Sequence, residues 1–256
     1  MDHSILIQAR LSSKRLPGKI LFKLGNSSHS AITLLCERLK TLQNEFDVAF
    51  ITSDKDCDKA ISLVTNKKNF KCFKGSHSDV LKRYYDCATF LKSKTIIRIT
   101  SDCPLVDPNE IRRLLKIHQD NNNDYTTNTF EGSSIVDGFD VEVFSYKALK
   151  RAYEEASLPS DREHVTFFFK EDNNFKIEYV DPNLNFPYTR LTLDTPEDFE
   201  AISKLLDQVE NIEELSMIEI INNFYKLNLN KINSSIPKNH GWQDSFIKDE
   251  KYKKML

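Results

Sequence analysis

Short apolar runs alternate with helix-like segments through the first half of the chain. Runs of strand length cover residues 4–9, 48–52, 70–73 and 95–100. Between and after them, apolar residues recur at helical spacing over 31–42, 56–65, 79–91 and 108–118, and the last segment begins with Asp107 as N-cap and Pro108 at its first position. This alternation predicts a mostly parallel, open sheet with helices on both faces, which is an α/β fold of three layers.

The second half of the chain is less regular. Strand-like runs at 125–129, 141–144, 175–180 and 188–193 are interleaved with helix-like runs at 146–155, 163–170 and 196–206. Strands this close in sequence predict a small antiparallel sub-layer beside the main sheet. From about Asp207 the composition turns to Asn, Lys and Glu. We therefore predict one α/β domain over 1–206 and a C-terminal helical appendage over 207–256.

Composition and charge exclude several classes of protein. Hydrophobic residues make up 39% and charged residues 29%, which is typical of a globular protein. A formal net charge of −2 argues against a nucleic-acid binder, which usually carries a basic surplus. No apolar stretch approaches the ~18 residues of a membrane span, and the N-terminus lacks the basic start of a signal peptide. The five cysteines are scattered without a CxxC pair, which favours reduced thiols and a cytoplasmic location.

The loop after the first strand is unusually basic. Four cations lie between residues 10 and 19, namely Arg10, Lys14, Arg15 and Lys19. Fixed cations, serine hydroxyls and a Pro-Gly turn are what a bound triphosphate requires. The spacing is not that of a Walker loop, and the GxGxxG of a dinucleotide-binding dehydrogenase is missing. A solvated basic loop is the alternative interpretation.

Two aspartates follow later strands of the predicted sheet. Asp102 comes directly after the fourth strand, and Asp194 follows the run at 188–193. Parallel sheets bind ligands at the carboxyl ends of their strands, and Mg²⁺ prefers one or two carboxylates together with phosphate oxygens. Two structural alternatives stay open, an Asx-turn at Asp102 and a helix N-cap at Asp194.

Five motifs together resemble one family. They are Gln-Ala-Arg-x-x-Ser-x-Arg-Leu-Pro-Gly-Lys at 8–19, Ile-Thr-Ser-Asp-Cys-Pro-Leu at 99–105, Asp-Gly-Phe-Asp-Val-Glu-Val-Phe at 137–144, Arg-Glu-His-Val-Thr at 162–166 and Leu-Asp-Thr-Pro-Glu-Asp at 193–198. This set is similar to the CMP-sugar synthetase group, which includes the Kdo and N-acylneuraminate cytidylyltransferases and the spore coat polysaccharide biosynthesis protein F type. The resemblance covers residues 4–206.

The resemblance implies a Rossmann-like fold of the nucleotide-diphospho-sugar transferase type, and it also assigns roles. Arg10, Arg15 and Lys19 would be catalytic, and Asp102 and Asp194 would hold Mg²⁺. The nucleotide would be bound by Ala9, Arg10, Ser13, Lys14, Arg15, Lys19 and Ser101. A homodimer is common in the group. Serine stands at 12 and 101 where the family usually has glycine, and the added Cβ atoms narrow backbone approach to the nucleotide.

The acceptor side is less specific. Asp140 and Glu142 share one face of a predicted strand, which could bind sugar hydroxyls or simply face solvent. Arg162 could pair with a sugar carboxylate, and His164 could contact the sugar or be an ordinary partly buried histidine. The candidate acceptor residues are Asn128, Asp137, Asp140, Glu142, Arg162, His164 and Arg190.

We therefore expect an enzyme that transfers CMP from CTP to an acidic sugar and releases pyrophosphate, in the biosynthesis of a surface polysaccharide. Its partners would be small molecules and not a nucleic acid or a membrane. Two alternatives remain: the use of another nucleotide with another sugar or sugar phosphate, and a nucleotide-sugar binding module without turnover.

Overall fold

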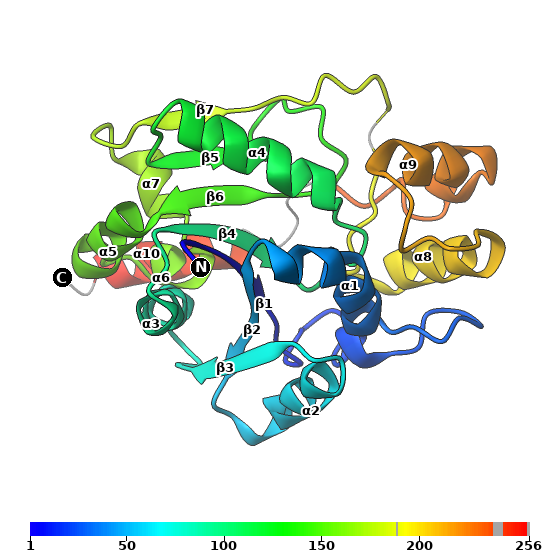
Figure 1. Ribbon diagram of the computed structural model, residues 1–256, viewed down its shortest axis with the longest axis horizontal. Coiled ribbons are helices and arrows are strands. Elements are labelled where there is room, and N and C mark those ends of the chain that lie inside the picture. The colour runs from blue at the N-terminus through cyan, green and yellow to red at the C-terminus, as the bar shows by residue number, and fades with distance from the viewer. Residues whose placement is uncertain (188, 238–242, 255–256) are drawn as a thin grey trace.

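One sheet with helices on both faces organises the chain (Figure 1). The protein is described by a computed structural model over residues 1–187, 189–237 and 243–254. Within these residues, seven strands run in the spatial order β3-β2-β1-β4-β6-β5-β7. The strands are β1 (His3–Gln8), β2 (Asp47–Ser53), β3 (Lys71–Gly75), β4 (Thr95–Thr100), β5 (Tyr125–Thr127), β6 (Glu142–Ser145) and β7 (Ile177–Tyr179).

Helices alternate with the strands from β1 to β5, and the later helices follow one another in two groups. The α-helices are α1 (Ala31–Leu39), α2 (Lys59–Lys67), α3 (Val80–Leu91), α4 (Pro108–Asp120), α5 (Tyr146–Glu155), α6 (Pro159–His164), α7 (Phe167–Glu171), α8 (Pro196–Gln208), α9 (Met217–Lys226) and α10 (Gln243–Lys253). Short 3-10 turns are η1 (Lys19–Leu21), η2 (Lys40–Asn44), η3 (Asp56–Asp58) and η4 (Leu229–Lys231). Asp107 caps α4 with Pro108 at its first position, as predicted.

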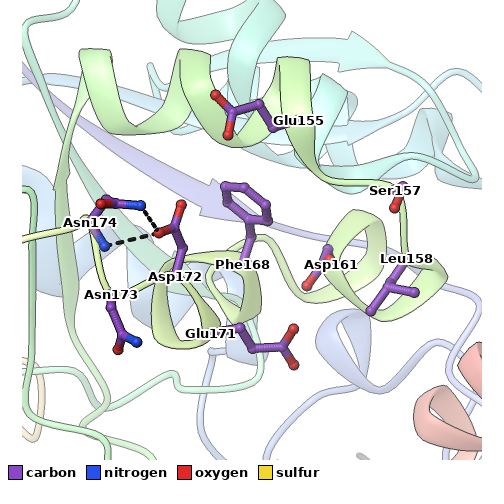
Figure 2. Close-up of a pocket in the computed structure, with 9 residues that line it drawn as sticks. All are labelled: Glu155, Ser157, Leu158, Asp161, Phe168, Glu171, Asp172, Asn173 and Asn174. Carbon is purple, nitrogen blue, oxygen red and sulfur yellow. Dashed lines mark hydrogen bonds between the residues drawn. The ribbon is translucent and has the colours of Figure 1, made fainter.

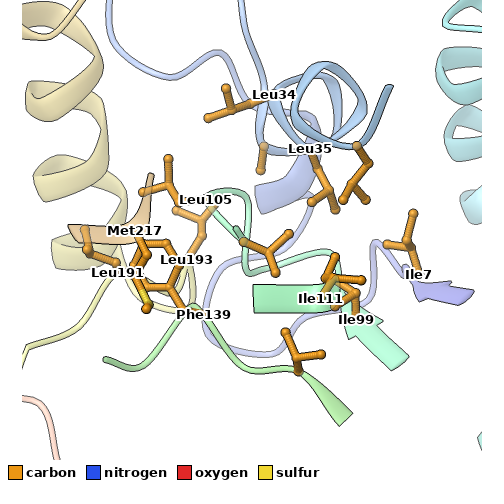
Figure 3. Packing of buried hydrophobic residues seen from close by; sticks show 14 of the residues in the cluster. Ile7, Leu34, Leu35, Ile99, Leu105, Ile111, Phe139, Leu191, Leu193 and Met217 are labelled. Carbon is orange, nitrogen blue, oxygen red and sulfur yellow. The ribbon is translucent and has the colours of Figure 1, made fainter. Parts of the chain in front are cut away.

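Successive side chains of the central strands point to opposite faces of the sheet and contribute to two apolar cores. Ile5 and Ile7 of β1 belong to the cluster formed with α1, α4, α8 and α9, part of which Figure 3 shows, whereas Leu6 belongs to the cluster formed with α3, α5 and α7. All three side chains are fully buried. Because successive side chains point to opposite faces of a strand, one apolar run supplies both cores. The predicted three-layer α/β fold is confirmed.

The antiparallel pairing lies inside the main sheet and does not form a separate layer. β1 pairs in parallel with β2 and β4, as predicted. After β5 the chain loops back, and β6 runs antiparallel between β4 and β5. Because β6 is hydrogen-bonded to one strand on each side, it is an interior strand of the main sheet. The separate antiparallel sub-layer expected from the sequence is therefore not formed.

Two other expected elements differ in detail. The helix predicted over 163–170 is interrupted at Val165, whose φ of 69° is incompatible with a continuous helix, and the chain forms α6 and α7 instead. The strand predicted over 188–193 is reduced to a single parallel bridge between Asp137 and Arg190. Residue 188 lies outside the described residues.

The segments after residue 207 pack on two different parts of the fold. Met217 and Phe224 of α9 are buried in the cluster around α1. Arg38 of α1 is also buried and donates to the carbonyl groups of Val106, Ile212 and Leu215 at 2.7–2.9 Å. α10 lies beside α6, on the other side of the molecule from α9 in Figure 1. Across the described residues, no helix combines the length and apolar character needed to span a membrane.

Candidate active site

A cavity of about 580 Å³ opens at the carboxyl ends of β1 and β4. Its walls come from the loop after β1, the loop after β4, β6, α6, α7, α10 and the segment before α8. It collects thirteen of the residues predicted from sequence, namely Arg10, Ser13, Lys14, Arg15, Lys19, Ser101, Asp102, Asp137, Asp140, Glu142, His164, Arg190 and Asp194. Segments from the first tenth to the last quarter of the chain therefore converge on one cleft.

The basic loop has a fixed backbone. The amide groups of Ser13 and Gly18 both donate to the carbonyl oxygen of Leu11 at 2.9 Å, which folds the loop into a compact turn. Gly18 adopts a φ of 75°, a conformation that glycine takes at no steric cost. Asp58 is fully buried and accepts a hydrogen bond of 2.8 Å from the amide of Leu11. This turn holds the cations at the mouth of the cleft.

Lys19 joins the two predicted metal carboxylates. Its ammonium group lies 3.1 Å from Asp102 Oδ2 and 2.9 Å from Asp194 Oδ1. The Lys19 side chain is buried, and Arg15 also pairs with Asp194. Burial raises the pKa of Asp102, but the charge of Lys19 and hydrogen bonds from Thr100 and Lys19 outweigh it and lower that pKa to about 2. Asp102 therefore stays ionised, and both carboxylates converge on the Lys19 ammonium nitrogen.

The capping alternative for Asp194 is not what the fold adopts. Thr195 is the N-cap of α8 and forms a capping box with Asp198. Asp194 precedes this cap, and its side chain is directed to Lys19 and Arg15. Asp198 has a structural role behind the cavity lining: its buried carboxylate accepts two hydrogen bonds of 3.0 Å from Arg190 and so fixes the position of that side chain.

Arg190 also connects Asp198 with the loop that precedes β6. Its guanidinium donates to Asp137 Oδ2 at 2.8 Å. Gly138 lies directly against the chain at 191, because a Cβ at this position would approach the carbonyl carbon of Leu191 to 2.5 Å. The loop at 137–141 and the segment before Asp194 are therefore packed backbone to backbone.

The cavity lining also contains a buried ion pair and neighbouring acids. Arg98 of β4 pairs with Glu142 of β6, which also accepts hydrogen bonds from Tyr125 and Thr166. Glu142 is buried, so the alternative of a solvated strand face is excluded for it. Burial, and then the charge of nearby Asp140, raise the pKa of Asp137 to about 7.

His164 forms part of the same wall. It stacks on Phe167 with ring centroids 4.4 Å apart. Burial lowers its pKa to about 4, so the imidazole is neutral at pH 7. A neutral ring can accept or donate a hydrogen bond to a sugar hydroxyl, but it contributes no charge.

Three predicted residues do not line the cavity. Ala9 is buried, and its amide donates to the carbonyl of Ile51. Asn128 is fully buried and bonds within the protein, to Glu110, to the carbonyl of Phe139 and to the amide of Val141. Arg162 faces Asp79 at 3.6 Å and the ring of Tyr153. The predicted substrate contacts of Asn128 and Arg162 are thus replaced by structural contacts.

Sequence reasoning missed several residues of the site. Asp58 has a signal that could have found it, since it follows β2 and so reaches the same edge of the sheet as the basic loop. Glu163 is part of the Arg-Glu-His motif, but its role was not recognised. Lys170 and Lys248 line the cavity from α7 and α10, and neither carries a local sequence signal.

A second cavity of about 550 Å³ lies between α5, α6 and α7 (Figure 2). Four carboxylates line it, from Glu155, Asp161, Glu171 and Asp172. Burial, and then the charges of Glu171 and Asp249, raise the pKa of Asp161 to about 6. An acidic lining disfavours a nucleotide triphosphate, so the cleft with the basic loop remains the candidate site.

Comparison with known proteins identifies the family. The model of the cytidylyltransferase family matches residues 4–229. The chain belongs to the cytidylyltransferase family. It is 30% identical over 232 residues to the spore coat polysaccharide biosynthesis protein SpsF of Bacillus subtilis. The aligned residues cover 86% of this chain and 92% of SpsF. The resemblance found in the motifs is therefore confirmed at the level of the family.

Solved structures share the architecture. A cytidylyltransferase from Leptospira borgpetersenii superposes with a TM-score of 0.84 at 29% identity, over 94% of this cytidylyltransferase and 100% of the Leptospira chain. A CMP:2-keto-3-deoxy-manno-octonic acid synthetase in complex with CTP superposes with a TM-score of 0.61 at 16% identity, over 81% of this chain and 99% of the other, which shows a shared fold.

Proposed function

We propose that this cytidylyltransferase transfers CMP from CTP to a sugar acid and releases pyrophosphate, for the synthesis of a surface polysaccharide. The observation that carries the proposal is the convergence of Lys19, Asp102 and Asp194, with both carboxylates within 3.1 Å of one ammonium nitrogen. A module that only bound a nucleotide sugar would not require two aspartates beside a basic loop.

The phosphate end of the cleft supports nucleotidyl transfer. Arg10 and Arg15 suit forked contacts to phosphate oxygens, and Lys14 and Lys19 act as point charges. Ser13 and Ser101 supply hydroxyl groups at the same wall. Such a reaction depends mainly on positioning and on neutralisation of charge, because little covalent work falls to the protein. We assign these residues to CTP.

The donor set of Asp102 and Asp194 fits Mg²⁺. Both are hard oxygen ligands, and a Mg²⁺ ion typically takes one or two carboxylates with phosphate oxygens and water. Among the residues that the structure describes, no three His, Cys, Asp or Glu side chains are grouped to hold a metal. The pair would therefore hold the ion together with the substrate. Bound Mg²⁺ would supply neutralisation of the triphosphate and polarisation of the attacking hydroxyl.

The remaining lining of the cleft suits a polyhydroxylated acceptor. Asp137, Asp140 and Glu142 line it with carboxylate oxygens, and His164 adds a neutral ring. Asp137, with its pKa near 7, can accept a proton at neutral pH, so we assign it a part in orienting or deprotonating the attacking hydroxyl.

The proposal is tested by pyrophosphate release from CTP with a panel of sugar acids, beside thermal shifts with CTP, UTP, ATP and GTP with and without Mg²⁺. A nucleotide at ~100 times its dissociation constant should add about 2.7 kcal/mol of stability. We expect a shift with CTP that depends on Mg²⁺. An equal shift with all four nucleotides would contradict the choice of CTP. The cytoplasmic location and the homodimer expected from sequence remain proposals, and light scattering tests the dimer.

A further inference from the structure

The wall of the cleft beside α6 includes one residue from the C-terminal helix. α10 packs along α6, where the buried carboxylate of Asp249 accepts a hydrogen bond of 2.9 Å from the amide of Ser160. This contact anchors the helix. The preceding residue, Lys248, lines the cavity, and its side chain is 51% exposed. A cation from the far end of the chain is thus available to a ligand in the cleft.

Glu163 fixes the position of this cation. Its Oε2 lies 2.5 Å from the ammonium nitrogen of Lys248, and its Oε1 lies 3.9 Å from the guanidinium of Arg10. Burial raises the pKa of Glu163, but the hydrogen bond and charge of Lys248 outweigh it and keep that pKa below its usual range. Glu163 is therefore ionised at neutral pH and holds the Lys248 ammonium at the wall of the cavity.

The acceptor end of the cleft needs such a charge if the acceptor is an acid. Asp140, Glu142 and Glu163 line the cleft with carboxylates, of which Glu142 is paired with Arg98 and Glu163 with Lys248, so Asp140 is the one that would chiefly repel an acid. The guanidinium of Arg98 is already paired with Glu142 inside the protein, and Lys170, which also lines the cavity, is a buried cation whose charge acts on Glu142 and Asp140. Arg162, the partner expected from sequence, lies outside the cavity.

We propose that Lys248 binds the carboxylate of the sugar-acid acceptor and that Glu163 positions it for this contact. The proposal rests on the proposed function, since it concerns the acceptor of the same reaction. It makes Lys248 a specificity residue: its ammonium distinguishes a sugar acid from a neutral sugar of similar shape. No bond is made or broken by this residue.

The test uses the full chain and steady-state pyrophosphate release with 2-keto-3-deoxy-manno-octonic acid and N-acetylneuraminic acid as probes. Loss of one charged hydrogen bond predicts that Lys248→Ala raises the KM for the sugar acid about ten-fold. The KM for CTP and the thermal shift with CTP should stay at the wild-type value. Lys251→Ala is the matched control, because Lys251 is exposed on the same helix and does not line the cavity.

A second variant distinguishes binding of the sugar carboxylate by Lys248 from mere neutralisation of Glu163 by Lys248. In Glu163→Gln/Lys248→Ala the carboxylate exposed by the loss of the lysine is also removed. We expect the raised KM to persist, and we expect the carboxamide analogue of the sugar acid to give equal KM values with the wild type and Lys248→Ala. If the KM for the sugar acid is at the wild-type value in the double variant, or is unchanged in Lys248→Ala, the role of Lys248 is overturned but the proposed function is not. A wild-type enzyme that binds CTP but uses neither acid would overturn the acidic acceptor and this inference together.

Discussion

Lys19 and Asp102 are 83 positions apart in the sequence, yet the ammonium nitrogen of one lies 3.1 Å from a carboxylate oxygen of the other. The contact joins the loop after β1 to the loop after β4, which are neighbouring strands. Neighbouring parallel strands bring their carboxyl ends together, so the fold itself creates this pair. Its chemistry can be tested by removing either charge.

Asp102→Ala should abolish pyrophosphate release, with a loss of at least about a hundred-fold in rate, because a ligand to the triphosphate and its metal is removed. Lys19 keeps its contact with Asp194, so the melting temperature should change little. Asp120→Ala, at an exposed position on α4, is the control. Turnover close to the wild-type rate would remove Asp102 from the site.

Arg15→Ala should weaken CTP binding about ten-fold, since one charged contact to phosphate is lost. Isothermal titration calorimetry with CTP measures the effect. Lys23→Ala serves as the comparison, because Lys23 is an exposed cation nearby that does not line the cavity. An affinity unchanged by Arg15→Ala would favour the solvated basic loop that the sequence left as an alternative.

Gly138→Ala should disrupt both folding and activity. The glycine has a φ of 112°, and an added Cβ would meet the backbone of Leu191 at 2.5 Å, which pushes away the segment that carries Asp194. Gly132 also has a positive φ, of 85°, but no atom lies within 4 Å of its added Cβ. Gly132→Ala should therefore cost only about 1 kcal/mol of backbone strain. Equal losses of stability on urea unfolding would show that crowding at Gly138 is unimportant.

Arg98→Met should lower the free energy of unfolding by about 3–5 kcal/mol, because it leaves Glu142 buried without its partner. Arg98→Met/Glu142→Leu should recover part of this loss. The exposed pair of Arg112 and Glu45 offers a contrast, and Arg112→Met should cost less than about 1 kcal/mol. Urea titrations compare the three variants, and similar losses in both single variants would refute the distinction.

His164 predicts a pH dependence of stability. Burial lowers its pKa from 6.5 to about 4, so between these values the unfolded chain binds a proton that the folded chain does not. The contribution of His164 to stability should fall as the pH drops from 6.5 to 4, whereas Asp137 and Asp161, whose pKa values are raised to about 7 and about 6, contribute in the opposite direction. Relative to the wild type, His164→Gln should lose less stability on acidification over this range, because the contributions of His118, Asp137 and Asp161 are present in both proteins and cancel in the difference. Melting temperatures at several pH values give the slope, and an unchanged slope would contradict the burial of His164.

The parallel half of the sheet could be predicted because Ile5, Leu6 and Ile7 form a run that is buried on both faces. The position of β6 could not, since its pairing depends on a long-range choice of neighbour that local periodicity does not record. Local sequence also does not record long-range side-chain contacts, which is why the motif at 162–166 led to the prediction that Arg162 binds the substrate. The contacts with Asp79 and Tyr153 hold this side chain away from the cavity.

Lys248 and Arg10 flank the same glutamate although they lie near opposite ends of the chain. During synthesis, the sheet and the basic loop can form while the later residues are still inside the ribosomal tunnel. The cleft gains its last wall only when α10 has emerged and docked on α6. A fusion or affinity tag placed directly after Lys253 would consequently sit on the helix that borders the substrate, whereas one placed before Met1 would extend from the start of β1, away from the strand ends that carry the chemistry.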